Sequence, residues 1–119
     1  MMKLLRTKEC LIFEKLFPLE YKTFGCGPGG VGDWLVPDTM WGLSVKPACQ
    51  QHDHDYRFGS GSSEEHRKRC DDRMRLNMLI IVDSKSRSKT FKALRHVRVN
   101  AYYFWVRFGG GRSYWSERS

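Results

Sequence analysis

Long apolar runs are missing from this sequence, and their absence argues against a membrane-spanning helix. The longest near-apolar stretch, residues 74–82, is interrupted by Arg75 and Asn77, whereas a span needs about 20 predominantly apolar residues. The uninterrupted apolar core of a secretory signal peptide is also missing, because charged residues recur through the N-terminal segment. These residues are Lys3, Arg6, Lys8, Glu9, Glu14 and Lys15. We therefore expect no transmembrane segment and no classical secretion.

Cysteine is scarce as well, which excludes a fold held together mainly by disulfides. The four cysteines among 119 residues, Cys10, Cys26, Cys49 and Cys70, fall well below the density of a disulfide scaffold. With 40% hydrophobic and 29% charged residues, the chain has the composition of a folded protein with its own core. Its length is that of one domain rather than two, so we expect residues 1–119 to form a single domain.

Acidic residues are few in the second half of the chain. Residues 1–60 hold seven Lys and Arg against seven Asp and Glu, whereas residues 61–119 hold fourteen against six. The whole excess of the net charge of +8 therefore lies in the second half. A basic half indicates an anionic partner, which could be a nucleic acid, an acidic protein or a phospholipid surface.

Hydrophobic spacing and turn residues predict a mainly α-helical fold. A short N-terminal helix is expected to end before Pro18, and Pro47 and Ser63 are expected to begin two further helices, over 47–58 and about 64–82. A short Gly/Ser turn joins these two, so they should pack antiparallel. The predicted segments are an N-terminal segment (1–22), a glycine-rich loop and connector (23–46), the helix pair (47–84) and a C-terminal basic and aromatic segment (85–119).

A third helix is predicted from about residue 88 to residue 108. Apolar and aromatic residues gather on one of its faces, which we expect to pack in the core. This face comprises Phe91, Leu94, Val97, Ala101, Phe104, Trp105 and Phe108. Its basic edge is formed by Lys89, Lys92, Arg95 and Arg98. That edge is either simply solvated or, for a lipid substrate, part of an interfacial surface.

The stretch CQQHDHDY, residues 49–56, concentrates chemically active side chains on one predicted helix. Cys49, His52, Asp53 and Tyr56 follow the i, i+3, i+4, i+7 spacing of a single helix face. Residues on the opposite side are Gln50, Gln51, His54, Asp55 and Arg57. We therefore expect His52 and Asp53 to face inward and His54 and Asp55 to face outward.

The second helix offers His52 a carboxylate partner. Asp71 shares an otherwise apolar face with Met74, Met78 and the Ile81–Val82 pair, and a carboxylate on such a face is costly unless it is paired. Asp72 points about 100° away and is expected to be solvated. An inward Asp71 facing His52 and Tyr56 is either a structural hydrogen-bonded knot or part of an active site, and the spacing alone does not decide between them.

The loop ahead of the helix pair favours the active site. Residues 24–30, FGCGPGG, hold four glycines in seven positions, which frees the backbone to turn several carbonyls toward one point. Carbonyl oxygens together with one carboxylate, such as Asp53, suit Ca²⁺. Cys26 could also fasten this loop to Cys49, one helical turn before His52.

These motifs together resemble the secreted phospholipase A2 family. GCGPGG is followed after about twenty residues by CQQHDHDY, and CDDRMRLNM at 70–78 resembles the second catalytic helix of phage, bacterial and parvoviral relatives. The closing AYYFWVRFGGGRSYW is similar to the C-terminal segment of the phage-type group. The resemblance implies a compact fold with two antiparallel catalytic helices, a glycine-rich calcium loop and a third C-terminal helix.

The resemblance also implies a role for each matching residue. His52 would be the general base, Asp71 would hold its far ring nitrogen, and Tyr56 would orient Asp71. The carbonyls of Gly25, Gly27 and Gly29 with the Asp53 carboxylate would bind Ca²⁺, and the Gly27 amide would donate to the oxyanion. Cys26 and Cys49 fall where the family places a disulfide between loop and helix.

Some features depart from the family pattern or stay open. Most of the family's disulfides and the two-stranded wing of the animal enzymes are missing, which favours the compact phage-type architecture. Cys10 and Cys70 have no counterpart and are either paired with each other or free. Trp34, Leu35, Trp41 and Leu43 either line an acyl-chain channel or simply pack. The other histidines, His54, His66 and His96, are expected on the surface.

The sequence therefore predicts a calcium-dependent phospholipase A2 that hydrolyses the sn-2 ester of glycerophospholipids. It is expected to act as a monomer at a membrane surface, with anionic lipid favoured and no nucleic-acid partner. One alternative is a catalytically silent protein of the same fold that binds membranes. The other is a small basic nucleic-acid-binding protein, although no recognisable binding motif supports it.

Overall fold

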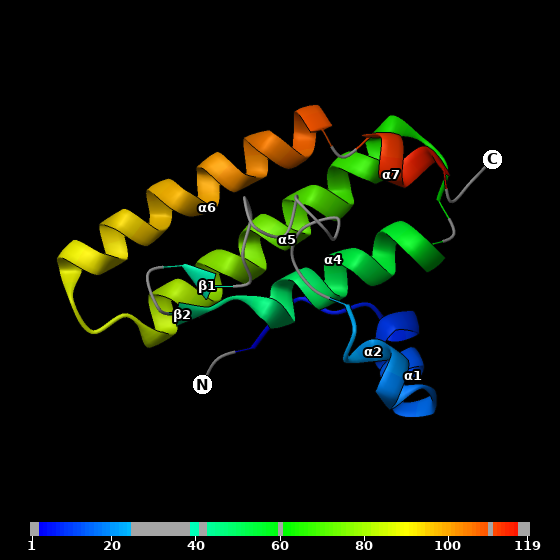
Figure 1. Cartoon of the computed structure of the whole chain (residues 1–119), viewed down its shortest axis with the longest axis horizontal. Coiled ribbons are helices and arrows are strands. Elements are labelled where there is room, and N and C mark those ends of the chain that lie inside the picture. Colours follow the sequence, from blue (N-terminus) through cyan, green and yellow to red (C-terminus); the bar gives the residue numbers. More distant parts are fainter. Residues whose placement is uncertain (1–2, 25–38, 41–42, 60, 110, 117–119) are drawn as a thin grey trace.

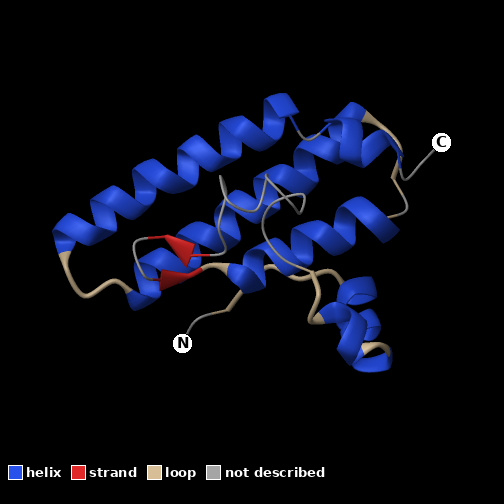
Figure 2. Cartoon of the chain, viewed as in Figure 1, coloured by secondary structure: helices blue, strands red, loops and turns tan. Residues whose placement is uncertain are grey.

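A computed structural model of the chain describes residues 3–24, 39–40, 43–59, 61–109 and 111–116. Within these ranges the protein is mainly helical, as predicted, with one short β-hairpin (Figures 1 and 2). The elements are α1 (Lys8–Leu16), α2 (Pro18–Tyr21), β1 (Thr39–Met40), β2 (Leu43–Ser44), α4 (Lys46–Phe58), α5 (Glu64–Lys85), α6 (Lys89–Gly109) and α7 (Gly111–Ser116).

The helix boundaries follow local sequence signals. The side chains of Thr7 and Ser63 cap α1 and α5 by accepting hydrogen bonds from the backbone N–H groups of Cys10 and His66, which satisfies donors that have no partner inside the helix. Predicted helices over 47–58, 64–82 and 88–108 are confirmed to within a few residues. The short helix α2 and the hairpin, in which Thr39 pairs with Ser44, were not predicted.

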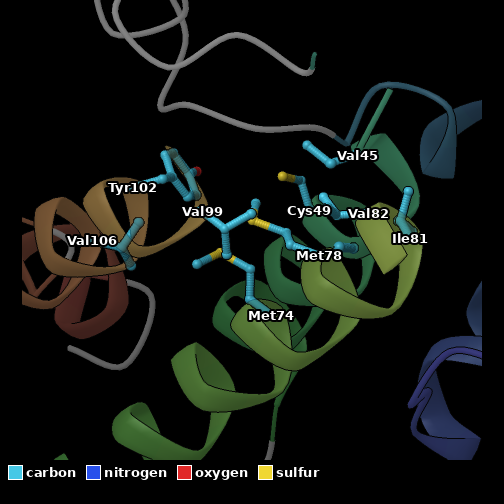
Figure 3. Packing of buried hydrophobic residues seen from close by; sticks show 10 residues of the cluster. Val45, Cys49, Met74, Met78, Ile81, Val82, Val99, Tyr102 and Val106 are labelled. Atoms are coloured by element: carbon cyan, nitrogen blue, oxygen red, sulfur yellow. The ribbon is translucent and has the colours of Figure 1, made fainter. Parts of the chain in front are cut away.

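The central element is α5, which packs against α4 on one side and α6 on the other (Figure 1). The helix α4 runs antiparallel to α5, as predicted from the short connection between them. The predicted apolar face of α5 is confirmed, because Met74, Met78, Ile81 and Val82 are all buried. The core between the three helices also contains Val45, Ala48, Cys49, Val99, Tyr102 and Val106 (Figure 3).

The prediction for the buried face of α6 was wrong. Val99, Tyr102 and Val106 point toward Met74 and Met78 of α5 (Figure 3). The expected core residues are exposed instead: Phe91, Leu94, Val97, Ala101, Phe104, Trp105 and Phe108.

Polar contacts with α5 explain this rotation of α6. We call them the polar ladder: His96 with Asp83 at 2.7 Å, Asn100 with Arg75 at 2.7 Å, Tyr103 with Asp72 at 2.5 Å and Arg107 with Asp71 at 2.7 Å. The four α6 members recur at i, i+4, i+7 and i+11, so they form one stripe beside the buried valines. Facing this stripe away from α5 would leave Asp71 without its Arg107 partner, at a large cost for a buried charge.

The N-terminal segment covers the side of α4 that was expected to face solvent. The Gln51 side chain accepts a hydrogen bond from the Thr7 N–H at 3.0 Å and donates to the Thr7 hydroxyl at 3.1 Å. On α5, the buried Asn77 side chain bonds both backbone groups of Leu5, at 2.6 and 2.8 Å. Two buried amides therefore hold the chain in place ahead of α1.

This cover makes the outward assignment of His54 and Asp55 wrong. His54 is 3% exposed and lies beside the Phe13 ring, at 5.3 Å between ring centroids. Asp55 is 4% exposed, accepts from Gln51 at 2.8 Å and forms an ion pair with Arg73 at 2.6 Å. The helical spacing correctly placed His52 and His54 on different sides of α4. Both sides are covered, however, one by α5 and the other by the N-terminal segment.

None of the helices in the described part of the chain combines the length and apolar character needed to cross a membrane.

The core offers a direct test of this packing. Met78 is fully buried between the helices, whereas Leu76 on the same helix is 46% exposed. We expect Met78→Ala to lower the free energy of unfolding by about 2–5 kcal/mol, since it leaves a cavity. Leu76→Ala should change it by no more than about 0.5 kcal/mol. Urea unfolding followed by circular dichroism measures both, and equal losses would contradict the described orientation of α5.

Candidate active site

The site centres on Asp71, whose side chain is 0% exposed. Nε2 of His52 lies 2.7 Å from Oδ1 of Asp71, and the Tyr56 hydroxyl donates to the same oxygen at 2.6 Å. The other carboxylate oxygen, Oδ2, accepts from Nη1 of Arg107 at 2.7 Å. The structure therefore brings together the three residues predicted to form the site and adds an arginine from α6.

The charges around Asp71 keep its carboxyl group ionised. Burial alone would raise the pKa of Asp71, but the hydrogen bonds and charge of His52, together with the bonds from Tyr56 and Arg107, lower it below its usual value of 3.8. A second guanidinium, that of Arg67, lies 3.8 Å from Oδ2. An ionised carboxylate can only accept, so the ring nitrogen facing it must carry a proton.

This assignment fixes the tautomer of His52 in its neutral form. With the proton on Nε2, the lone pair is on Nδ1, the nitrogen that can accept a proton. The His52 side chain is 11% exposed, and its ring also lies against the Tyr56 ring at 4.3 Å between centroids. No group in the described part of the chain hydrogen-bonds to Nδ1. Within the described residues, the imidazole is therefore held at Nε2 by Asp71 and not at Nδ1.

Tyr56 connects the carboxylate to the C-terminal end of the chain. Its ring meets that of Tyr114 in α7 edge to face, at 5.1 Å, and both are buried together with Cys70. Burial and the neighbouring charge of Asp71 raise the pKa of the Tyr56 hydroxyl. The hydroxyl therefore stays protonated and donates to Asp71, while its predicted orienting role stays a prediction.

The choice between the two neighbouring aspartates is settled by the structure in favour of Asp71. Asp72 accepts from Lys68 at 2.7 Å and from Tyr103, and its side chain is 41% exposed. It has no contact with His52. The 100° step between consecutive residues was thus sufficient to assign the buried carboxylate correctly.

The predicted calcium ligands are described only in part. Asp53 is half-buried and accepts from Nε of Arg57 at 3.1 Å, and the Arg57 guanidinium lies over the Phe24 ring at 5.2 Å from its centroid. Phe24 is the first residue of the glycine-rich stretch 24–30, so Arg57 links the Asp53 carboxylate to the start of that stretch. Gly25, Gly27 and Gly29 lie outside the described residues, as does the oxyanion donor expected at Gly27.

A carboxylate beside a loop of backbone carbonyls has the hard oxygen chemistry that Ca²⁺ prefers. Asp53 is the described donor that fits this set. Among the described residues there is no cluster of three or more His, Cys, Asp or Glu side chains placed to hold a metal ion. A site of the predicted kind does not need such a cluster, because most of its ligands are carbonyl oxygens.

The cysteines divide into two kinds. Cys10 and Cys70 are both buried and neither is disulfide-bonded, so they do not pair with each other. Cys49 is buried and disulfide-bonded. Its predicted partner, Cys26, lies outside the described residues, and the pairing between them stays a prediction.

Sequence reasoning missed the arginines that flank Asp71. Arg107 was not assigned to the site, and Arg67, whose Nη2 donates to the Arg107 backbone carbonyl at 3.1 Å, was not considered. The polar stripe of α6 was the available signal for Arg107, because it is the last member of the i, i+4, i+7, i+11 series. Arg67 lies one helical turn before Asp71, and i, i+4 spacing places the two on one face.

The remaining histidines lie outside the site. His96 is on the surface, as predicted, and bonds Asp83 at 2.7 Å. His66 is half-buried and bonds the Tyr114 hydroxyl at 2.7 Å, while His54 is buried as described above. Trp34, Leu35 and Trp41, considered for an acyl-chain channel, lie outside the described residues, whereas Leu43 packs at the edge of the main core.

Comparison of the chain with protein-family models, with curated proteins and with solved structures gives no match.

Asp71 and Asp72 form a matched pair for testing the site. Asp71→Asn should lower the free energy of unfolding by about 3–5 kcal/mol at neutral pH, since it removes the charge that two partly buried guanidinium groups face. Asp72→Asn should cost less than about 1 kcal/mol, because its pair with Lys68 is exposed. Urea unfolding at neutral pH gives both values, and equal losses would contradict the central position of Asp71.

The effect of Asp71→Asn should also depend on pH. The pKa of Asp71 in the folded protein lies below its usual 3.8. Its ionised form therefore stabilises the fold above that pH, and the contribution is lost as the pH falls through the folded-state pKa. We expect the difference between the native protein and Asp71→Asn to be constant from neutral pH to about pH 5 and to shrink below about pH 4.

Proposed function

We propose that this protein is a calcium-dependent phospholipase A2 that hydrolyses the sn-2 ester of glycerophospholipids. The observation that carries the proposal is the contact of His52 with the buried Asp71, supported by Tyr56. A fully buried carboxylate that orients a histidine through Nε2, with the other ring nitrogen, Nδ1, left unbonded by the described residues, supports a general base at this position. The resemblance of the surrounding motifs to secreted phospholipase A2 supplies the substrate class.

The proposed reaction begins when Nδ1 of His52 takes a proton from water. The hydroxide equivalent attacks the sn-2 carbonyl carbon, and the resulting imidazolium is stabilised by the Asp71 carboxylate 2.7 Å from Nε2. His52 then gives the proton to the departing glycerol oxygen as the carbon–oxygen bond breaks, so that a free fatty acid and a lysophospholipid are produced. Asp71 stays ionised throughout, because Tyr56 and Arg107 hold its two oxygens.

Calcium is the proposed cofactor. Asp53 and the carbonyls of Gly25, Gly27 and Gly29 would hold it, and the bound ion would polarise the ester carbonyl. The Gly27 amide is proposed as the protein donor to the oxyanion. The position of Asp53, linked through Arg57 to Phe24 at the start of the loop, supports this ligand set.

The proposed fold is the compact phospholipase A2 architecture, with α4 and α5 as its two catalytic helices. A disulfide between Cys26 and Cys49 would fasten the calcium loop to α4. The proposed enzyme works as a monomer at a phospholipid surface, and no nucleic-acid partner is proposed. The central position of α5 between α4 and α6 supports the assignment, because it places Asp71 where residues from both neighbouring helices can reach it.

The first test of this function is His52→Gln. Glutamine can still donate an N–H to Asp71, so the fold should be retained, but its amide cannot accept a proton at neutral pH. We expect hydrolysis of a fluorescent sn-2-labelled phospholipid to fall by about 10²-fold or more. His96→Gln, which changes an exposed histidine bonded to Asp83, should retain activity. Equal activity of the two variants would contradict the assignment of His52 as the base.

The second test concerns the metal. One carboxylate with carbonyl ligands should bind Ca²⁺ with a dissociation constant on the order of 10⁻⁴–10⁻³ M, measured by calorimetry. Asp53→Asn should abolish this binding together with the activity. Arg57→Gln is the matched control, because it removes the ion pair but leaves the Asp53 carboxylate. Full turnover in excess chelator would show that the loop has another purpose.

A further inference from the structure

The exposed face of α6 lies outside the proposed catalytic site. Six apolar residues lie along it and form what we call the outer strip: Ala93, Leu94, Val97, Ala101, Phe104 and Phe108. At 100° per residue they fall within an arc of about 100°, and from first to last they extend about 22 Å along the helix. Val97, Phe104 and Phe108 are 69%, 59% and 89% exposed.

The position of α6 leaves the outer strip uncovered by the described elements. The helix lies at the edge of the three-helix layer, with α5 on its other side (Figure 1). The polar ladder and the buried Val99, Tyr102 and Val106 fix the rotation, so the strip cannot turn inward without breaking four contacts with α5. An apolar face of this length on a helix that already has a packed face indicates a partner.

The charges of the chain segment that contains the outer strip are all of one sign. Residues 84–116 contain eight Lys and Arg and no Asp or Glu. Four of the basic residues are exposed and make no ion pair within the described ranges: Lys85, Arg87, Lys89 and Arg98. The nearby carboxylates of α5, Asp72 and Asp83, already contact Lys68, Lys92 and His96. The charge on and just before α6 that makes no described ion pair is therefore positive.

We propose that the outer strip is the surface by which this protein docks onto a bilayer that contains anionic phospholipid. A helix with Phe and Leu on one face and Lys and Arg beside it lies in the interface, with its apolar side chains among the acyl chains and its cations at the headgroups. This inference deepens the proposed function and rests on it for the choice of a phospholipid partner. It also gives the unpacked aromatic residues of α6 a use.

The same observations give less support to self-association through the strip and to membrane docking through α1 and α2. Pairing of two copies through this strip would bring cations together with no acidic residue on α6 to offset them, and like charges across an interface oppose association.

The exposed apolar residues of α1 and α2, such as Leu16 and Leu19, lie among Glu9, Glu14 and Glu20 as well as lysines. The net charge of that second surface therefore does not favour binding to an anionic bilayer.

The experiment compares two matched double variants. Val97→Gln with Phe104→Gln removes the middle of the strip, and Leu16→Gln with Leu19→Gln removes two side chains that are 65% and 79% exposed. Binding to vesicles of equal phosphatidylglycerol and phosphatidylcholine is measured by co-sedimentation in the presence of a calcium chelator. Because all four positions are exposed, both variants should have the same urea midpoint of unfolding as the native protein.

The strip variant should lose at least about tenfold in vesicle partitioning, while the α1/α2 variant should stay within about twofold of the native protein. Native binding should also weaken as salt increases. Equal binding by both variants, or equal loss in both, would overturn the proposal. A dimer in analytical ultracentrifugation that only the strip variant disrupts would overturn it in favour of self-association.

This design separates the docking surface from the catalysis. Binding is measured without calcium, so a protein that hydrolyses nothing can still confirm the strip as the docking surface. Hydrolysis of a soluble short-chain phospholipid should be the same in the strip variant and the native protein, because no strip residue contacts His52 or Asp71. Absence of hydrolysis in both would refute the proposed function alone. Loss restricted to the strip variant would overturn the separation of the two surfaces.

Discussion

The buried carboxylate of Asp71 is the constraint on which the rest of the structure depends. A fully buried charge is tolerated only when it is paired and hydrogen-bonded, and Asp71 obtains its partners from two different helices: His52 and Tyr56 of α4, and Arg107 of α6. The need to satisfy one carboxylate thus fixes how α4 and α6 lie against α5. The same contacts give His52 its tautomer, so packing and proposed chemistry have a common cause.

The arginine on Asp71 distinguishes this site from a simple His–Asp pair. Arg107 and Arg67 place positive charge beside the carboxylate that His52 uses, which keeps Asp71 ionised and reduces its tendency to take the proton from the imidazole. The arginine also connects α6 to the site. A helix whose outer face is proposed to contact a bilayer therefore supplies one of the groups that hold the proposed catalytic carboxylate.

The two wrong predictions of facing have the same origin. On α4, His54 and Asp55 were placed outside because one buried face was expected, but the segment around Thr7 and Phe13 covers the other side. On α6, the face with more aromatic residues was taken for the core, but the polar ladder requires the opposite rotation. In both cases the helical period was right, and the neighbour that covers the face was decided by contacts between residues far apart in the sequence.

The sequence by itself determined the longer helices and the grouping of His52, Tyr56 and Asp71. The local signals are the cap at Ser63, the proline at the start of α4 and the apolar series from Met74 to Val82. Helical spacing within α4 selects His52 and Tyr56, and helical spacing within α5 selects Asp71, so each selection is a property of one helix at a time. Only the tertiary structure decided that Arg107 meets Asp71, that His54 is buried and that the aromatic residues of α6 face outward. These depend on which surfaces meet, and a helix with apolar residues on two sides has no local signal that ranks one above the other. A buried charge is costly unless it is paired, and the observed rotation of α6 provides that pair through Arg107 while its aromatic face stays exposed.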